Sequence, residues 1–370
     1  MTEHLGAEPH ERSANRQGYR NGVRPRTLYT RVGPVTLQVP QTRDGSFSPE
    51  LFKRYQGSEQ AFVLALMEMV VQGVSTRKVT EVTEALCGAS FSKSTVSALC
   101  AGLDPRVRAF NERRLTADYP FVLVDALVLT VREADRVVSK AALIASGIRA
   151  DGVREILGIQ MGDSESFATW NDFFTGLKGR GLRGVLWVIS DSHAGLVEAA
   201  RKSFQGVAWQ RCQVHLMRTS CRTPRVAIGR KWWTTRVCGG THAKRIFRAN
   251  DIAEARAQLA TFVARFEKSA PKTVACLEDG FEDALSVIVL PEKYRKRLRT
   301  TNMQERLNEE IRRLIRIFPN TESALRLVGA LLAEYNEVSA ERHYLDMDEF
   351  QEWWAGRQPT HVGGNIVALS

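Results

Sequence analysis

Two aspartates lie in apolar segments of the sequence, where burying a charged carboxylate is energetically unfavourable. Asp125 interrupts the β-branched, apolar run of residues 121–131, and Asp191 ends a second apolar run, residues 185–191. A charged carboxylate in an apolar strand needs a compensating partner, and a divalent cation is one such partner because Mg²⁺ prefers oxygen ligands. If the two strands are neighbours, the carboxylates meet at one edge of a sheet. Two metal ions held there could support an in-line displacement at a phosphodiester bond.

A more ordinary interpretation of both aspartates remains open. Asp125 could pair with an arginine inside the fold. Asp191 could cap the helix that is expected after it, since aspartate is a preferred N-cap residue. His193, two residues further on, could contact a phosphate or could also serve only as a cap.

A third carboxylate is expected from a helix that crosses the same edge of the sheet. Glu305 lies in a helical run, residues 292–316, that carries nine lysines and arginines against four glutamates. Arg312 falls on the same face of that helix two turns later, where it could face phosphates. The alternative is an ordinary glutamate in a salt-bridged surface helix.

The elements that must position these residues are predicted by apolar periodicity within residues 119–212. Three strands joined by tight turns come first, and two further strands follow, each after a helix. This order predicts an α/β fold, a mixed sheet with helices packed on it, and it is the order found in ribonuclease H-like nucleases and integrases. The predicted strands are 121–131, 137–148, 153–161, 185–191 and 207–212, and the predicted helices are 167–177 and 194–204.

The residues before this block divide into two regions. Residues 1–57 are polar and rich in arginine, with one short strand predicted at 36–39, and they form a basic arm that is either loosely ordered in solvent or in contact with DNA. Residues 58–115 predict helices at 61–71, 76–86 and 95–103, with capping serines. Short helices joined by a glycine-containing turn fit a helix-turn-helix, although many helical bundles fit the same pattern.

Composition bounds the partner and the compartment. The chain has 370 residues, a net charge of +11 and a pI near 9.6, an excess that favours a polyanion such as nucleic acid. No apolar stretch reaches the roughly 20 residues that span a bilayer, and the first residues do not resemble a secretory signal. The six cysteines lack the spacing of a disulfide framework, which favours reduced thiols and a cytoplasmic protein.

Seven motifs, in order and over nearly the whole chain, resemble the Mutator-like transposases of bacterial insertion sequences. They are GYRNG (18–22), QGVSTRKV (72–79), FSKSTVS (91–97), VDAL (124–127), VISD (188–191), WQRCQVH (209–215) and LRTTNMQE (298–305). The resemblance implies a DDE transposase, whose catalytic and metal-binding triad falls on Asp125, Asp191 and Glu305. Cys212 and His215, a weak zinc signal by their spacing, are then residues that support the site together with Arg312.

The resemblance also implies an architecture and partners. It implies a ribonuclease H-like core whose last strand-to-helix link is replaced by a helical insertion, residues 213–290. Helices in 291–350 would complete the core, and 351–370 would form a tail. Two Mg²⁺ or Mn²⁺ ions are implied as cofactors. Double-stranded DNA is implied as partner, as terminal inverted repeats and target, with a homodimer associated with the nucleoid.

Two other functions remain open from the residues alone. Residues 219–241 lack helical periodicity, and residues 310–319 form a shorter arginine-rich stretch than in the family. These departures would fit a catalytically impaired DNA-binding remnant of a transposase. The other possibility is a ribonuclease H-like nuclease without sequence preference, whose binding would fall equally with salt on any duplex.

Overall fold

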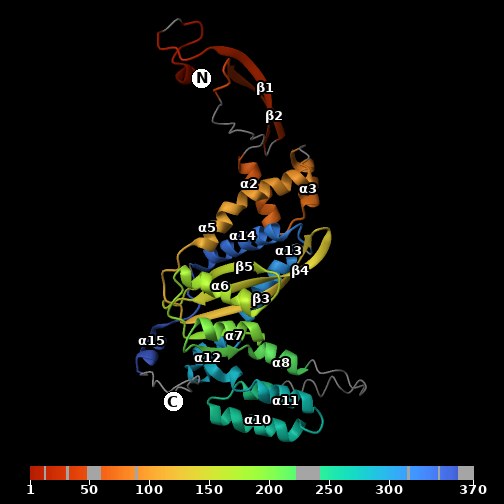
Figure 1. Cartoon of the computed structure of the whole chain (residues 1–370), viewed down its shortest axis with the longest axis vertical. Helices are drawn as coiled ribbons and strands as arrows, with labels where there is room; N and C mark the ends of the chain where they lie inside the picture. Colours follow the sequence, from red (N-terminus) through yellow and green to blue (C-terminus); the bar gives the residue numbers. More distant parts are fainter. Residues whose placement is uncertain are drawn as a thin grey trace. The chain divides into compact units, whose positions relative to one another are not determined.

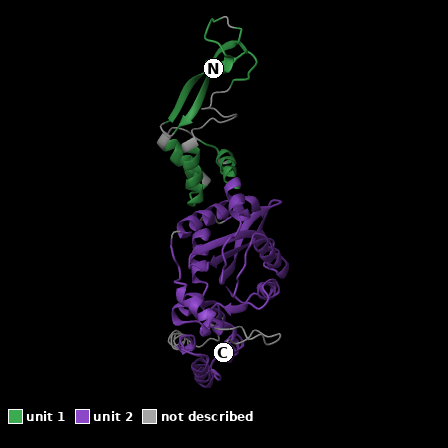
Figure 2. Cartoon of the chain, turned by 90° about the vertical axis from the view of Figure 1, so that its left-hand side faces the viewer, with its two compact units in different colours: residues 1–104 green, residues 105–370 purple. Residues whose placement is uncertain are grey.

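The computed structural model describes residues 1–11, 14–30, 33–47, 60–87, 91–221, 242–314, 317–340 and 342–356. The chain divides into two compact units, residues 1–104 and residues 105–370 (Figure 2). In the described residues, no helix has both the length and the apolar character needed to cross a membrane.

The first unit begins with a short helix, α1 (Thr2–Leu5), and an antiparallel hairpin of β1 (Arg20–Thr30) and β2 (Gly33–Thr42). The sequence predicts only four of these hairpin residues as a strand. The hairpin escapes prediction because most of its side chains are exposed, so its residues carry no apolar alternation. The basic arm is therefore regular β-structure over residues 20–30 and 33–42.

Short helices follow the hairpin, as the sequence predicts. Ser75 accepts a hydrogen bond from the Lys78 amide at 3.3 Å, and Ser92 accepts one from the Thr95 amide at 3.1 Å, so both serines act as N-caps. Leu66, Val79 and Val96 are fully buried. The elements are α2 (Gln60–Val71), α3 (Thr76–Cys87), α4 (Lys93–Cys100) and the 3-10 helix η1 (Ala101–Leu103).

The second unit is built on a five-stranded mixed sheet with the strand order β5-β4-β3-β6-β7. The strand β4 is antiparallel to both of its neighbours, β3 and β5, whereas β6 and β7 run parallel to β3. All five strands were predicted from the sequence, and their ends differ by only a few residues. They are β3 (Phe121–Glu133), β4 (Arg136–Ile148), β5 (Arg154–Gly162), β6 (Trp187–Ser190) and β7 (Ala208–Arg211).

One face of the sheet is covered by the two crossover helices, α6 (Phe167–Gly179) and α7 (Ala194–Ser203) (Figure 1). These helices bury an apolar cluster against alternate residues of the strands, including Val122, Val124 and Val188. A Cβ on Gly195 would lie 2.6 Å from the Phe167 amide nitrogen, so glycine lets the start of α7 approach the start of α6. Helix α5 (Asp104–Glu112) precedes β3.

The other face is covered by elements from the C-terminal part of the chain. The apolar cluster on this side joins Phe121, Leu123 and Ile189 of the strands to the helices that follow residue 290. These helices are α12 (Glu292–Leu298), α13 (Asn302–Leu314), α14 (Thr321–Ala340) and α15 (Asp348–Ala355).

Two sequence predictions in this region are wrong. The basic run 292–316, predicted as one helix, is two helices, because the chain breaks at residues 299–301. Residues 351–355, predicted as part of a tail, belong to α15, which packs Phe350 into the core. The rest of that predicted tail, from residue 357, lies outside the described residues.

Residues between β7 and α12 form helices with an apolar cluster of their own, built around Phe262, Phe266 and Leu277. Residues 222–241, most of the stretch without helical periodicity, lie outside the described residues. The elements are α8 (Gln213–Cys221), α10 (Ile252–Phe266), α11 (Pro271–Asp279) and the 3-10 helix η2 (Asp283–Val289).

Candidate active site

The two aspartates lie at the same level of adjacent strands. Leu123 of β3 pairs with Ile189 of β6 in a parallel register. Asp125 and Asp191 each follow their paired residue by two positions, so strand alternation directs both toward the same face. That face is the one covered by α13 rather than the one covered by α6 and α7. The predicted convergence of these residues at one edge of the sheet is therefore present.

Asp125 is buried, with 9 % of its surface exposed. Its Oδ2 accepts a hydrogen bond from Nδ2 of Asn308 on α13 at 2.7 Å, and its Oδ1 accepts one from the Ala126 amide at 3.0 Å. Burial, followed by the negative charge of Asp191, raises the pKa of Asp125 to about 7 against the opposing effect of His215. No described arginine or lysine forms an ion pair with Asp125, which removes the simplest alternative explanation of this residue.

Asp191 lies between β6 and α7. Its Oδ1 accepts a hydrogen bond from the His193 amide at 3.2 Å. The N-cap of α7 is His193 itself, without a hydrogen bond from its side chain. Asp191 therefore orders the turn before α7 but is not its cap. Ser190 lies buried next to it, where it donates to the Asp191 carbonyl at 2.7 Å and accepts from the Trp209 indole at 2.9 Å.

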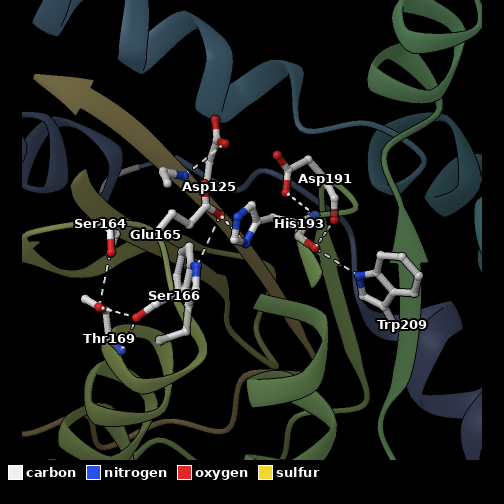
Figure 3. A network of polar contacts seen from close by, with 11 residues as sticks. Asp125, Ser164, Glu165, Ser166, Thr169, Asp191, His193 and Trp209 are labelled. Atoms are coloured by element: carbon white, nitrogen blue, oxygen red, sulfur yellow. Dashed lines mark hydrogen bonds and ion pairs between the residues drawn. The ribbon is translucent and has the colours of Figure 1, made fainter. Parts of the chain in front are cut away.

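Sequence reasoning missed a carboxylate at this edge, Glu165. It precedes Ser166, the N-cap of α6, and accepts a hydrogen bond from the Trp170 indole at 3.2 Å. Nδ1 of His193 lies 3.6 Å from Glu165 Oε1. Burial raises the pKa of Glu165, and the charge of Asp191 adds to that rise. Figure 3 shows Glu165 coming from the loop before α6. No periodicity marks a loop residue, so the sequence offered no signal for it.

Glu305 lies on α13 but has cationic partners from α8. Its carboxylate oxygens are 2.5 and 3.3 Å from the guanidinium of Arg218, and Oε1 lies 3.3 Å from His215 Nε2. Within the described part of the chain, no group of three or more histidine, cysteine, aspartate or glutamate side chains is close enough to hold a metal ion. The structure thus joins Asp125 to Asp191, while Glu305 is held by Arg218 and His215, and His215 interacts electrostatically with Asp125 as well. Arg312 is exposed on the same helix.

Cys212 and His215 connect β7 to the break between α12 and α13. The Thr301 amide and hydroxyl both donate to the buried Cys212 Sγ at 3.3 Å, and the Gln213 amide donates to the Arg299 carbonyl at 3.0 Å. These contacts fix residues 299–301, which explains why the predicted single helix is interrupted. The interaction with the Cys212 side chain, together with the charges of Asp125 and Glu305, raises the pKa of His215 to about 9 against the opposing effect of burial.

The donor set of this edge fits a divalent cation. Asp125 and Asp191 supply hard carboxylate oxygens, and the repulsion between them would be relieved by a positive ion. Oδ1 of Asn308 is buried without a hydrogen-bond partner among the described residues. Such an unpaired amide oxygen is a further oxygen donor beside Asp125. Zinc fits less well, because Asp125, Asp191 and Asn308 offer oxygen donors, whereas structural zinc sites use mainly cysteine sulfur and histidine nitrogen.

Comparison with known proteins decides the family. Residues 1–340 match the family described as "Transposase, Mutator family". The chain belongs to that family. The transposase for insertion sequence element ISRM5 of Rhizobium meliloti is 46% identical over 361 residues, which cover 95% of this chain and 88% of the relative. The transposase for IS256 in transposon Tn4001 of Staphylococcus aureus is 44% identical, over 94% of this chain and 89% of the relative.

A third relative of this Mutator-family chain extends the same match. The transposase for insertion sequence element IS406 of Burkholderia multivorans is 42% identical, with 90% of this chain and 85% of the relative covered. Matches of this length and identity do not favour the interpretation of the chain as a catalytically impaired remnant. Transposases in general cut DNA, join it to a new site and use divalent metal ions.

Proposed function

We propose that this chain is the transposase of an insertion sequence, an enzyme of the DDE type that cuts terminal inverted repeats and transfers the strand to target DNA. The observation that carries the proposal is the pairing of Asp125 and Asp191 at one edge of the sheet, with the pKa of Asp125 raised by burial and by its neighbour. Family membership supplies the reaction class, and the names of the relatives supply the insertion sequence as the element moved.

The strand arrangement supports a ribonuclease H-like core. Three antiparallel strands are followed by two strands parallel to the first, each reached through a helix on one face, in the spatial order β5-β4-β3-β6-β7. Residues 213–290 are then the helical insertion, and the helices after residue 290 complete the core. The helices of residues 58–115 and the β1–β2 hairpin are the proposed DNA-binding region.

In this proposal Asp125, Asp191 and Glu305 hold two Mg²⁺ or Mn²⁺ ions. The ions would activate the attacking oxygen and stabilise the leaving oxygen of the phosphodiester. Asn308 orients Asp125 through its hydrogen bond, and the Ser190–Trp209 bond holds the strand end before Asp191. Glu305 must then exchange Arg218 for a metal ion and move toward the aspartates, because the three described carboxylates are not grouped closely enough to hold an ion as they stand. Arg312, which is exposed, is available to a phosphate.

The decisive experiment is cleavage and strand transfer on DNA that carries the terminal repeats of the element, with and without Mg²⁺. Asp191→Asn should lower the rate by about a thousandfold or more, because the neutral amide binds a metal ion far more weakly. The exposed Asp172 on α6 offers a matched control, and Asp172→Asn should keep the full rate. If Asp191→Asn keeps wild-type cleavage, the assignment of the site is wrong.

Glu305 needs its own control because it lies outside the aspartate pair. Glu305→Gln should lose activity to a similar extent, whereas Glu309→Gln, at an exposed position of the same helix, should not. Wild-type activity in Glu305→Gln would leave Glu165 as the better third carboxylate. A homodimer is also proposed, since two DNA ends must be brought together, and light scattering of the protein with repeat DNA should give the mass of two protein chains plus the bound DNA.

A further inference from the structure

Two hollows in the second unit meet at the break between α12 and α13. The larger, of about 620 Å³, lies among α12, α13, the end of α14 and the start of β5. The smaller, of about 180 Å³, extends from the same place toward α8 and Phe247. Lys296, Thr300 and Asn302 line both hollows, so the two form one groove. We call it the α12–α13 groove.

The lining of the α12–α13 groove is strongly cationic. Glu310 is the one carboxylate among the lining residues, and it already pairs with Arg313 at 2.8 Å. None of the lining arginines and lysines forms an ion pair with a described residue. A groove lined by cationic side chains without carboxylate partners attracts a polyanion. The cations are Arg154, Lys244, Arg248, Lys296, Arg297, Arg299, Arg306 and Arg342.

Arg154 gives the groove a built anion position. Its Nε is buried without a hydrogen-bond partner among the described residues. Burial lowers the pKa of Arg154, because removing the guanidinium from water disfavours its charged form. Because Arg154 lines the groove, a phosphate bound there would offset the desolvation of this charge.

Aromatic rings lie among these cations. Tyr335 of α14 lines the groove and is 37% exposed although it is a large side chain. The guanidinium of Arg297 lies 5.2 Å from the centre of the Tyr344 ring, also in the lining. Cationic grooves that carry exposed aromatic rings are the arrangement by which proteins hold single-stranded nucleic acid, since every base has a face that can stack.

We propose that the α12–α13 groove binds a single DNA strand, with its phosphates on the cations and a base stacked on Tyr335. A hollow of about 620 Å³ is of the size that encloses a small-molecule ligand, so it takes one or two nucleotides and not a duplex. In a duplex the base faces are stacked on one another and cannot reach a tyrosine ring. The cations of the groove alone would not make this distinction.

The groove adjoins the candidate active site, which gives the single strand its source. Arg306, in the groove, follows Glu305 on α13, and Thr300 precedes the Thr301 that Cys212 holds. The inference therefore rests on the proposed function, in which cleavage frees a strand end beside the carboxylates. The groove would hold the strand that continues from the cleaved phosphodiester.

The test is the affinity of the full chain for a labelled oligothymidine strand, measured by fluorescence anisotropy without metal ions. Tyr335→Ala should weaken binding of the single strand about tenfold through loss of stacking, and Tyr335→Phe, which keeps the ring, should restore it. Binding of a duplex of equal length should not change in either variant. Equal weakening for strand and duplex, or no weakening for either, overturns the proposal.

The cations are tested by the salt dependence of the same binding. Arg306→Ala with Arg342→Ala should lower the slope of log affinity against log salt by about 1.4, because each phosphate contact on a single strand contributes about 0.7. Lys268→Ala with Lys272→Ala, at exposed positions outside the groove lining, removes the same charge and should leave the slope unchanged. An equal change in both double variants would mean that only net charge matters, and would overturn the proposal.

The outcome is separable from that of the proposed function. Binding measured without metal ions in the Asp191→Asn background involves no cleavage. Specific loss of single-strand binding in Tyr335→Ala supports the groove even if cleavage fails. Cleavage that depends on Asp191, with single-strand binding indifferent to Tyr335, supports the active site and refutes the groove.

Discussion

The two faces of the five-stranded sheet differ in what they bury. The face under α6 and α7 is apolar across its length, from Val122 and Val124 to Val188. The opposite face is apolar at one end but carries polar pairs where α13 crosses it. Asn308 donates to Asp125 there, and Ser146 donates to Gln304 at 2.9 Å, with both partners buried. One face thus carries stability, while the other holds polar groups whose desolvation must be offset by specific partners.

This difference between the two faces of the sheet explains the position of the candidate site. Side chains that alternate along one strand supply both faces, so the strand that contributes Val124 to the apolar cluster contributes Asp125 to the site. The apolar face makes the strand rigid. A rigid strand holds the carboxylate in one geometry, which a metal site requires.

The largest expected contrast is at Asp125. Asp125→Asn should lower DNA cleavage by about a thousandfold or more, yet leave the thermal midpoint unchanged or raise it. The pKa of this carboxyl is raised to about 7, so above that pH the folded state holds an unfavourable charge that asparagine removes. Calorimetry in buffer free of metal ions measures this. A large fall in the midpoint would mean that Asp125 supports the fold instead.

The apolar face should behave in the opposite way. Phe174 is fully buried on α6, and Phe174→Ala should lower the free energy of unfolding by about 3–5 kcal/mol through lost burial and a cavity. The rate per folded molecule should stay near that of the wild type, since Phe174 does not contact the carboxylates. Urea titration measures the free energy of unfolding. Titration with repeat DNA gives the concentration of binding-competent protein, from which the rate per folded molecule follows. A fall in the rate of Phe174→Ala under conditions where the variant is fully folded would contradict a purely structural role of the apolar face.

Asn308 should give an intermediate effect. Asn308→Ala removes the hydrogen bond that orients Asp125, and it should lower the rate about 10- to 100-fold and raise the Mg²⁺ concentration needed for half-maximal cleavage. A rate measured over a series of Mg²⁺ concentrations distinguishes this from simple destabilisation, which would leave the metal requirement unchanged. Ser146→Ala, which removes a buried bond further along the same face, is the control and should leave that requirement as in the wild type.

The smallest effect concerns Tyr119, an ionisable residue of the apolar cluster under α6 and α7. Tyr119 donates to Glu155 Oε2 at 2.5 Å, and burial with that bond raises its pKa above the usual value near 10. The folded state then resists ionisation, so its share of stability is full below pH 10 and is lost as the pH rises beyond it. The free energy of unfolding of Tyr119→Phe, measured by urea titration, should fall less steeply than that of the wild type between pH 9 and about 11. Parallel curves for both proteins would contradict this.

Much of the fold was predictable because it rests on local patterns. Apolar periodicity placed the five strands and the helices α6 and α7, since each element must bury one side. The pattern failed where side chains are mostly exposed, as in the β1–β2 hairpin. It also failed at residues 299–301, where Cys212 and Gln213 end a helix from far away in the sequence.

The same division holds for the site. Asp125 and Asp191 were predicted to meet because each interrupts or ends a buried strand, and the parallel register of those strands puts them at one level. Glu165 was missed because it lies in a loop. The ion pair of Glu305 with Arg218 could not be predicted from the sequence either, because the two residues are 87 positions apart.

By itself the sequence determined the family, the strands and the aspartates that mark the edge of the sheet, because these depend on neighbouring residues and on recognisable motifs. Only the tertiary structure decided which cations hold Glu305, which amide orients Asp125 and where the α12–α13 groove opens. Those features depend on how distant helices pack, and packing is settled by the whole set of side chains that must fill one interior together.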